Sequence, residues 1–225
     1  SANYVIEKIK EFLKKNNKIN TDWNAFNILS NNASTVGSYD LNILSSKGKN
    51  NKVLKGIEHK KFKILFLLGL DEIHFKKNNE FIVYMGSHGD KGAEISDVIL
   101  PGAAYTEQDG FFTNLEGKIQ KAYKASYPPG EAKEDWVIIN ELASKIKSKE
   151  LYKNKDELEK SMMNYLKITS SEKNNNNFEN FNFVNEKINL NEIDYYYSNV
   201  IARSSKTMSR CRQEKIKFKD TGTEV

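Results

Sequence analysis

Three short, uninterrupted apolar runs in the middle of the chain constrain its fold more than any other feature. They span Lys63–Leu68, Phe81–Met85 and Val98–Leu100, and polar segments separate them. Continuous apolar runs of this length are typical of strands that are buried on both faces, because a strand with one wet face alternates apolar and polar residues. The runs therefore predict an α/β fold, in which a parallel sheet has helices on both faces and right-handed connections.

Helical periodicity is expected on both sides of this sheet. Tyr4–Lys14 carries apolar residues at helical spacing, and Thr21 is a plausible N-cap for a second helix that runs through Ala33. Glu134–Lys147 has acidic residues at its start and lysines at its end, which suits the helix dipole. The apolar face of that helix includes Trp136, which we expect to be a core anchor. Three further segments are a polar loop at Ser45–Asn51, a turn between two extended pieces within Phe111–Tyr127, and a helix at Lys155–Ile168.

Charge and cysteine content limit the partners and cofactors that the chain can bind. The chain has 35 basic and 30 acidic residues and a net charge of +5, but the charge is spread and lacks the interleaved aromatics or arginines of a basic groove. We therefore expect no nucleic-acid partner. The single cysteine, Cys211, cannot hold a cubane iron–sulfur cluster, which needs about four thiolates, nor form a disulfide within the chain. A mean hydropathy of −0.67 and the lack of a long apolar run predict no direct membrane insertion.

The segment from Phe81 to Ile139 carries the most specific pattern. Its motifs are, in order, His88-Gly89-Asp90, Gly92-Ala93, SDVILPGAAYTE at Ser96–Glu107, NLEGKIQ at Asn114–Gln120, PPGEA at Pro128–Ala132 and DWVI at Asp135–Ile138. In order and spacing these motifs resemble the C-terminal part of the largest peripheral-arm subunit of respiratory complex I, NADH:ubiquinone oxidoreductase, of the molybdopterin-oxidoreductase superfamily. An upstream strand at Ile64–Asp71 and a tail at Ile201–Cys211, similar to the mitochondrial form, extend the resemblance to roughly two thirds of the chain.

The resemblance implies three parts. Residues 1–149 would be the C-terminal α/β lobe of a molybdopterin-oxidoreductase-like domain, 150–190 a helix with an Asn- and Lys-rich insertion, and 191–225 a docking tail. Within the insertion, Thr169–Phe183 is low in complexity and polar, as in a surface loop or disordered segment. The family's full subunit is longer, so the lobe would be incomplete without the remainder. Whether separate genes or processing would divide such a subunit is left open.

The function implied is a non-catalytic structural portion of that subunit, in support of NADH-to-ubiquinone electron transfer by flavin and clusters on other chains. No catalytic, cofactor-binding or metal site is expected on this chain. The iron–sulfur clusters are expected on the N-terminal part of the subunit, which would be a partner together with other peripheral-arm subunits on the matrix side of the inner mitochondrial membrane. Two alternatives are part of a molybdopterin-dependent oxidoreductase that binds a pterin dinucleotide, and a free-standing α/β binding module. Whether the chain is an enzyme is left open.

Two loops could still carry chemistry. Gly86–Gly92 follows a predicted strand, and glycines there would allow a phosphate to approach the backbone, but the loop matches neither G-x-G-x-x-G nor the Walker A spacing. A tight connecting loop is the preferred interpretation. His88 with Asp90 and Asp97 could form an acid–base pair or a metal site, although a loop histidine bound to a neighbour is commoner. The other histidines, His59 and His74, are isolated.

Two more segments are rich in interacting groups. The polar set within Tyr105–Gln120 could grip a substrate, but near Gly and Pro such residues more often satisfy buried backbone groups. The tail Glu192–Arg212 has more apolar and aromatic surface than a free tail needs, so we expect it to dock on another part of the subunit or on a neighbouring chain. Packing on this chain's own core is the alternative. The residues concerned are Thr106, Glu107, Asn114, Glu116 and Gln120 in the first set, and Tyr195, Tyr196, Tyr197, Ile201, Arg203, Lys206, Met208, Arg210 and Arg212 in the tail.

Overall fold

A computed structural model describes residues 2–20, 22–30, 32–43, 49–73, 75–172 and 194–220. The chain forms two compact units, each assembled from segments that are distant in the sequence. Unit 1 takes its residues from 1–44, 111–120 and 158–191, and unit 2 from 45–110, 121–157 and 192–225. The domain boundaries expected from the sequence stay a prediction.

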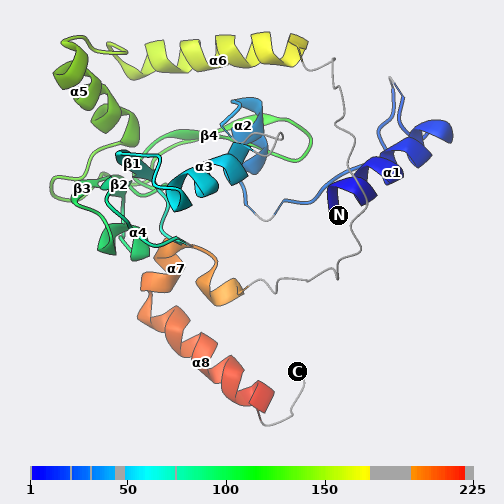
Figure 1. The fold of residues 1–225 in the computed structure, drawn as a ribbon. Helices are drawn as coiled ribbons and strands as arrows, with labels where there is room; N and C mark the ends of the chain where they lie inside the picture. Colours follow the sequence, from blue (N-terminus) through cyan, green and yellow to red (C-terminus); the bar gives the residue numbers. More distant parts are fainter. Residues whose placement is uncertain are drawn as a thin grey trace. The chain divides into compact units, whose positions relative to one another are not determined.

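A parallel sheet of three strands forms the centre of unit 2 (Figure 1). Its strands are β1 (Ile64–Leu68), β2 (Phe81–Gly86) and β3 (Val98–Pro101), in the order β1-β2-β3. Both pairs of neighbours are parallel, with Ile64 opposite Phe81 and Val83 opposite Val98. The α/β class and the parallel sheet expected from the three apolar runs are confirmed.

Burial differs among the three strands. In β2, Ile82 and Tyr84 on one face are 0% and 1% exposed, and Met85 on the other is 4% exposed. In β1, by contrast, Phe66 is 50% exposed, and in β3 Ile99 is 55% exposed. The expectation of burial on both faces is therefore right for β2 and wrong for β1 and β3. The reason is position in the sheet, since an edge strand has a neighbour on one side only and the apolar run does not reveal which strand is central.

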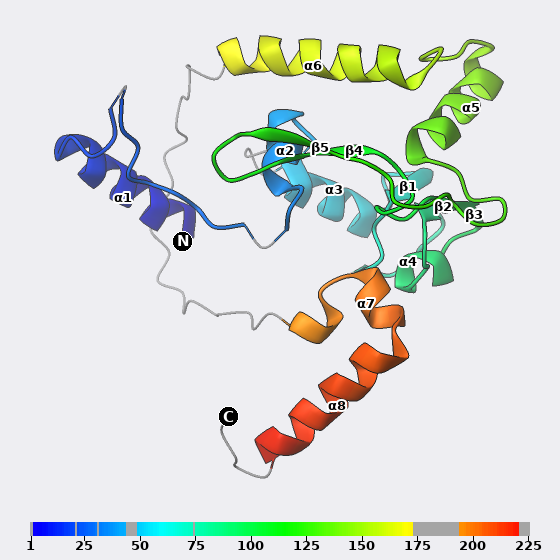
Figure 2. The same ribbon diagram turned by 180° about the vertical axis from the view of Figure 1, so that it is seen from behind.

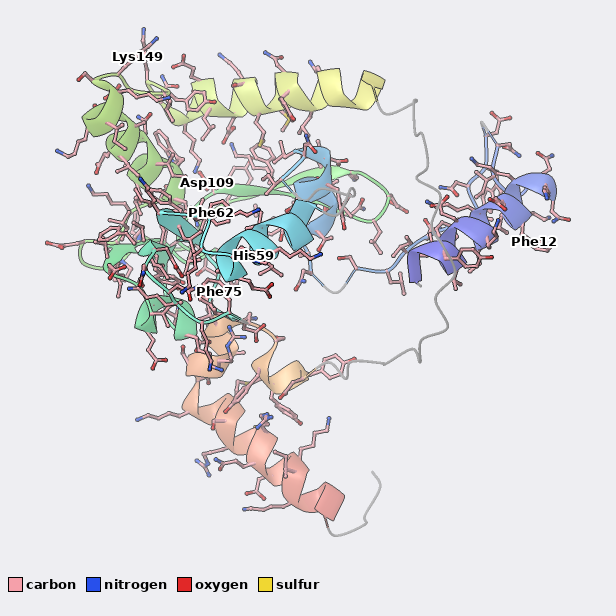
Figure 3. The ribbon with its side chains drawn as sticks, in the orientation of Figure 1. Phe12, His59, Phe62, Phe75, Asp109 and Lys149 are labelled. Atoms are coloured by element: carbon pink, nitrogen blue, oxygen red, sulfur yellow. The ribbon has the colours of Figure 1, made fainter. Side chains whose placement is uncertain are left out.

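The core of unit 2 lies on one face of this sheet. Leu67, Ile82 and Tyr84 are its buried centre, and Ile73 and Phe75 pack against them. Phe75 is labelled in Figure 3. These last two residues belong to the connection between β1 and β2, whose described residues contain no helix. The short helix α4 (Lys91–Glu94) follows β2 and packs on it. The sequence predicted helices on both faces of the sheet, whereas side chains of the β1–β2 connection, Ile73 and Phe75, pack on this face together with Ala93 of α4.

Five more helical elements belong to unit 2. The helix expected at Glu134–Lys147 is confirmed, but its buried residue is Ile138, at 9% exposure, and Trp136 is only half-buried. The expectation that Trp136 is a core anchor is therefore wrong within the described residues. The polar loop expected at Ser45–Asn51 gives way to a helix from Lys49 onward, and 45–48 lie outside the described residues. The elements are α3 (Lys49–Glu58), α5 (Asp135–Lys147), the 3-10 turn η1 (Tyr195–Tyr197), α7 (Val200–Ser204) and α8 (Lys206–Asp220).

Unit 1 contains α1 (Ala2–Lys15), α2 (Thr35–Asp40), the ends of β4 (Gly110–Thr113) and β5 (Ile119–Ala122) with the turn between them, and most of α6 (Lys155–Glu172). The helices expected near the N-terminus and from Lys155, and the turn between two extended pieces, are confirmed. α6 includes residues 169–172, which were expected to be low-complexity loop; the rest of that stretch, from 173, lies outside the described residues.

The helix expected from Thr21 through Ala33 is wrong. Residues 22–30 contain no helix, Thr21 itself is outside the described residues, and α2 begins only at Thr35. The side-chain oxygen of Asn20 accepts the N–H of Trp23 at 2.8 Å, and that of Asn24 accepts the N–H of Phe26 at 3.0 Å. Such local bonds give the backbone an alternative to the helical ladder, which explains the failure of the apolar spacing here.

None of the helices in the described part of the chain is both long and apolar enough to cross a lipid bilayer.

The fit of α4 against β2 gives a first prediction. A Cβ on buried Gly92 would lie 2.3 Å from the backbone oxygen of Leu70 and 3.1 Å from the ring of Tyr84. We expect Gly92→Ala to lower the free energy of unfolding by about 1–3 kcal/mol, as overpacking does, although alanine favours helix. Urea-dependent pulse proteolysis of the chain measures this. Gly110→Ala is the matched control, because nothing lies within 4 Å of its Cβ position; an equal loss in both variants would contradict the prediction.

Candidate functional site

The carboxyl ends of β1 and β2 meet at one edge of the sheet, the place where open parallel α/β sheets commonly bind ligands. Each strand leads into a loop that turns at a glycine with positive φ, at Gly69 (+60°) and Gly89 (+63°). The phenol of Tyr84, at the end of β2, donates a hydrogen bond to the carboxylate of Asp71 in the first loop. Burial and this bond raise the pKa of Tyr84, so the phenol remains a donor and joins β2 to the loop after β1.

A guanidinium from the C-terminal tail closes this edge. Nε of Arg203 donates to Asp90 at 2.7 Å, and Nη1 donates to Glu72 at 2.9 Å and to the backbone oxygen of Tyr197 at 3.3 Å. Glu72 lies in the loop after β1 and Asp90 in the loop after β2, so one side chain, 19% exposed, bridges both. Figures 1 and 2 place α7, which carries Arg203, beside α4.

The tail also folds on itself. Asp194 accepts the N–H of Tyr196 at the start of η1 and an N–H of Arg212 from α8, which lowers the pKa of its carboxyl. The Arg212 guanidinium lies 4.7 Å from the centre of the Tyr197 ring, and the Tyr197 hydroxyl donates to Ser209 at 3.0 Å. The described tail therefore packs on its own unit, as the alternative in the sequence analysis held. Its docking on a partner stays a prediction.

The loop edge is poorly suited to a phosphate. The carboxylates of Asp71, bound to Tyr84, and of Glu72 and Asp90, bound to Arg203, lie in its loops and would repel an anion. Dinucleotide sites present free backbone N–H groups of a helix N-terminus to the phosphates. Here the carboxylate of Asp90 accepts the N–H of Lys91 at 3.0 Å, at the start of α4. The residues present do not fit a pterin dinucleotide, which favours the interpretation of Gly86–Gly92 as a tight connecting loop.

The second candidate set is not assembled. Asp97 lies just before β3, at the amino ends of the parallel strands, whereas His88 and Asp90 follow the carboxyl end of β2. Its carboxylate accepts from Lys77 at 2.6 Å and from the N–H of Ile82 at 2.8 Å, which lowers its pKa. His88 is exposed, with Nδ1 2.9 Å from the hydroxyl of Ser87. Among the described residues, which omit His74, no three His, Cys, Asp or Glu side chains are close enough together to hold a metal ion.

The polar set within Tyr105–Gln120 makes local bonds. Glu107 accepts the N–H of Ala104 at 2.9 Å, and the side-chain oxygen of Asn114 accepts the N–H groups of Glu116 and Lys118 at 3.0 and 2.9 Å. The backbone oxygen of Thr106 accepts the N–H of Ala125 at 2.8 Å. Within the described residues, no buried side-chain nitrogen or oxygen lacks a hydrogen-bond partner. These contacts favour the structural interpretation of the set.

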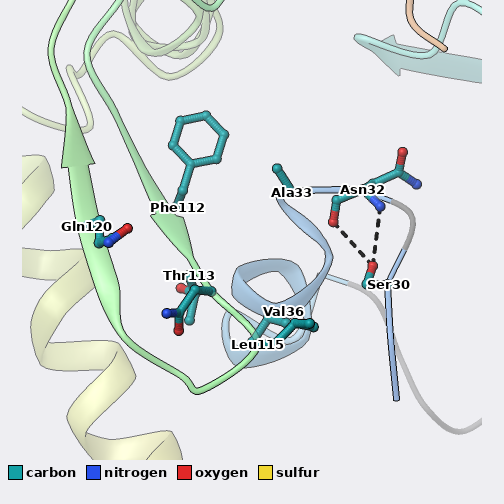
Figure 4. A pocket seen from close by; sticks show the side chains of 9 residues that line it. Ser30, Asn32, Ala33, Val36, Phe112, Thr113, Leu115 and Gln120 are labelled. Atoms are coloured by element: carbon teal, nitrogen blue, oxygen red, sulfur yellow. Dashed lines mark hydrogen bonds between the residues drawn. The ribbon is translucent and has the colours of Figure 1, made fainter. Parts of the chain in front are cut away.

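Gln120 differs, because it lines a pocket in unit 1 of about 330 Å³ (Figure 4). The other walls come from the segment before α2 and from β4, and Ser30 and Asn32 hydrogen-bond to each other there. Nothing in the sequence pattern pointed to this pairing, since the two walls are far apart along the chain. Because no charged side chain lines the pocket, it cannot form charge-assisted hydrogen bonds to a phosphate. Its lining residues are Ser30, Asn32, Ala33, Val36, Phe112, Thr113, Asn114, Leu115 and Gln120.

A network that sequence reasoning missed lies at the start of α5. Burial opposes ionisation of Glu134, but bonds from Lys155 at 2.7 Å and Lys124 at 3.1 Å lower its pKa. Burial raises the pKa of the adjacent Asp135, which accepts from the Gln108 amide at 3.1 Å and returns its own N–H to that amide's oxygen at 3.2 Å. These bonds join the starts of α5 and α6 to the segment around Asp109 (Figure 3), so they support architecture.

The fold defines a class, an α/β lobe with a parallel sheet, in which Arg203 of the tail bridges the two loops at the carboxyl ends of β1 and β2. Residues 1–145 match the family model for molybdopterin oxidoreductase, and the chain belongs to that family. It is 40% identical over 217 residues to the NADH-ubiquinone oxidoreductase 75 kDa subunit of Reclinomonas americana, covering 92% of this chain and 31% of that protein.

Two other relatives have names of the same kind and similar coverage. The identity is 40% over 225 residues with a subunit of NADH-quinone oxidoreductase from Rickettsia bellii, covering 97% of this chain and 32% of that protein. It is 35% over 228 residues with the mitochondrial NADH-ubiquinone oxidoreductase 78 kDa subunit of Candida albicans, covering 92% and 30%. The resemblance noted in the sequence is confirmed. The chain spans about a third of the length of the curated relatives it matches.

The bridge made by Arg203 gives a second prediction. Arg203→Ala removes the bonds to Asp90 and Glu72, and because both pairs are partly exposed we expect a loss of about 1 kcal/mol. That corresponds to roughly fivefold faster cleavage within 194–205 under limiting protease. Arg210→Ala removes the same charge from an exposed position of α8 and serves as the control. Equal acceleration in both variants would show that the bridge does not hold the tail.

The buried carboxyl of Asp135 gives a third prediction. Because burial raises its pKa, the ionised form is less stable in the folded chain than in the unfolded chain. The stability contributed by the protonated form is present at acid pH and lost as pH rises through the raised folded pKa. Asp135→Asn keeps an acceptor for Gln108 without the charge, so its melting temperature should exceed that of the wild type at about pH 7, with a smaller gap at about pH 4. Thermal melts across pH measure this; a gap that widens toward acid contradicts it.

Proposed function

We propose that this chain is a non-catalytic structural portion of the large peripheral-arm subunit of respiratory complex I. Electron transfer from NADH to ubiquinone is then carried by flavin and clusters elsewhere in the assembly. The observation that carries the proposal is similarity over nearly the whole chain to proteins named as subunits of NADH-ubiquinone or NADH-quinone oxidoreductase, the 75 kDa and 78 kDa subunits among them. The acidic edge of the sheet supports a structural role, because its carboxylates, paired with Arg203, disfavour an anion there.

The proposal places no cofactor on this chain. Its one cysteine, Cys211, is exposed and cannot supply the thiolates of a cluster. The iron–sulfur clusters belong, in this proposal, to the N-terminal part of the subunit. The alternative, a lobe that binds a pterin dinucleotide, is less well supported, since the Gly86–Gly92 loop contains a carboxylate, Asp90, that is bound to Arg203.

The partners proposed are the cluster-bearing N-terminal part of the subunit and other peripheral-arm subunits. A relative whose name includes "mitochondrial" supports a location on the matrix side of the inner mitochondrial membrane. The tail, residues 191–225, remains a proposed docking element. Its α8 presents exposed Lys206 and Arg210, which suit an acidic surface on a neighbouring subunit.

The fourth prediction tests this role. Trp136 is half-buried, and its indole N–H donates to Glu134 at 3.1 Å within the network that holds the start of α5. We expect Trp136→Ala to lower the amount of assembled complex I several-fold while turnover per assembled complex is unchanged, because stability losses act through abundance. Native gels measure assembly, and NADH:ubiquinone turnover normalised to flavin measures the chemistry.

The other tryptophan provides the control. Trp23 is 63% exposed, and Trp23→Ala should leave assembly near the wild-type level. Normal assembly of the Trp136→Ala complex with altered turnover would indicate a role in the chemistry. A tagged chain that purifies without any complex I subunit would overturn the proposed function itself.

A further inference from the structure

We propose that an ion cluster at the start of α5 is a lock at the base of a hinge between the two units of the chain. Its members are Asp109, Lys124, Glu134 and Lys155, and all of them belong to unit 2. While the lock is intact, it fixes the directions in which three connections leave unit 2 for unit 1. When it opens, unit 1 moves relative to unit 2 without either unit unfolding. The hinge goes beyond the proposed function and does not depend on it.

The chain passes between the two units close to this cluster. Three of these passages lie in the described residues, between positions 110 and 111, 120 and 121, and 157 and 158. Asp109 lies just before the first passage, Lys124 shortly after the second and Lys155 shortly before the third. Each of these connections therefore has a charged side chain of the cluster at its base in unit 2.

Hydrogen bonds join the three bases to one another. The backbone N–H of Lys124 donates to the carboxylate of Asp109 at 2.8 Å. The ammonium group of Lys155 donates to the backbone oxygen of Asp109 at 3.3 Å and to its carboxylate at 3.5 Å. Both ammonium groups also bind Glu134, at 3.1 Å from Lys124 and 2.7 Å from Lys155. Glu134 is thus the centre at which the three connections meet.

The cluster is sheltered enough from water to hold this geometry. The side chains of Glu134, Lys155 and Asp109 are 15%, 23% and 23% exposed, and that of Lys124 is 34% exposed. Isolated ion pairs on a protein surface contribute little, whereas partly buried charges in a network are screened less by salt. Because carboxylates and ammonium groups are both charged at neutral pH, the bonds of the lock are present there.

Beyond the cluster, the connections have the features of hinges. α6 begins at Lys155 in unit 2 and continues into unit 1, so the direction of this long helix is set at its first residue. On the first connection, Asp109 is followed by Gly110, which has no atom within 4 Å of the position that a Cβ would occupy. Glycine leaves the backbone wide conformational freedom. Hinges are commonly a few residues at the ends of elements, and both places fit that description.

A purely local role within unit 2 is the alternative. In that case the cluster only stabilises the start of α5, and its loss loosens unit 2 itself. In a hinge lock, the loss changes the distances between the two units and leaves the distances within unit 2 as they were. Spin labels that measure both kinds of distance in the full chain distinguish the two roles.

Pairs of cysteines carry the labels, in a chain with Cys211→Ser because Cys211 is exposed. One pair, Ser34→Cys with Ile146→Cys, reports a distance between the units. The other pair, Lys61→Cys with Ile146→Cys, reports a distance within unit 2. All three labelled positions are exposed. Double electron–electron resonance then gives the distribution of each distance.

The test variant is Glu134→Gln, which removes the charge at the centre of the lock and keeps the size of the side chain. The control is Glu141→Gln on the same helix, since Glu141 forms an exposed pair with Lys133 at 2.8 Å outside the lock. We expect Glu134→Gln to widen the 34–146 distribution about twofold, because the hinge is then free, and Glu141→Gln to leave it unchanged. The 61–146 distribution should be the same in all chains.

Two results would overturn the hinge lock. One is a 34–146 distribution of equal width in the wild type and in Glu134→Gln. The other is a 61–146 distribution that widens in Glu134→Gln, because the cluster would then act within unit 2.

A milder variant keeps the proposal testable if Glu134→Gln does not fold. Lys155→Met removes the ammonium group at the start of α6 and leaves the bond from Lys124 to Glu134 in place. Lys133→Met is its control, because it removes the same group from the exposed pair with Glu141. We expect the 34–146 distribution to widen in Lys155→Met and not in Lys133→Met. Equal widths in these two variants would also contradict the lock.

Discussion

The burial of β2 between β1 and β3 is the constraint on which the rest of unit 2 depends. Ile82 and Tyr84 on one face, and Met85 on the other, are buried in the strand that has a parallel neighbour on both sides, and Ile73 and Phe75 pack over the first face. Parallel pairing brings the carboxyl ends of β1 and β2 to the same edge. Hence the two loops that follow them meet, and the Tyr84 phenol reaches Asp71.

The carboxyl-end edge of the sheet is the structural basis of the non-catalytic role that we propose. In open α/β sheets the edge is a crevice that binds a ligand, but here it is lined by carboxylates and bridged by Arg203 from the tail. The positive charge of Arg203 in the tail thus pairs with the negative charges of Glu72 and Asp90 in the loops. A similar arrangement of Lys124 and Lys155 around Glu134 joins the start of α5 to that of α6. Both networks link segments far apart in the sequence, which suits the structural role that we propose.

Much of this was predictable, and the failures have physical causes. The apolar runs predicted the strands and their parallel order, and the motif order predicted the family, because both are local patterns. The helix expected through Ala33 failed because Asn20 and Asn24 bond to the backbone, a competition that apolar spacing does not register. Trp136 lies at a helix start where its indole N–H reaches Glu134, and Ile138 is the buried residue instead. His88 and Asp97 were grouped because they are close in sequence. In the fold, His88 follows the carboxyl end of β2 and Asp97 precedes the amino end of β3, so the length of a strand separates them.

The sequence by itself determined the α/β class, the three strands, the family and the inability of a single cysteine to hold a cluster, because composition and periodicity act residue by residue. Only the tertiary structure decided which strand is central, which loops share an edge and which carboxylates Arg203 joins. Those properties depend on pairing between segments distant along the chain. The exposed stripe of Ile64, Phe66 and Leu68 is the clearest case: its residues have the same apolar character as β2, and only their place at the side of the sheet leaves them uncovered.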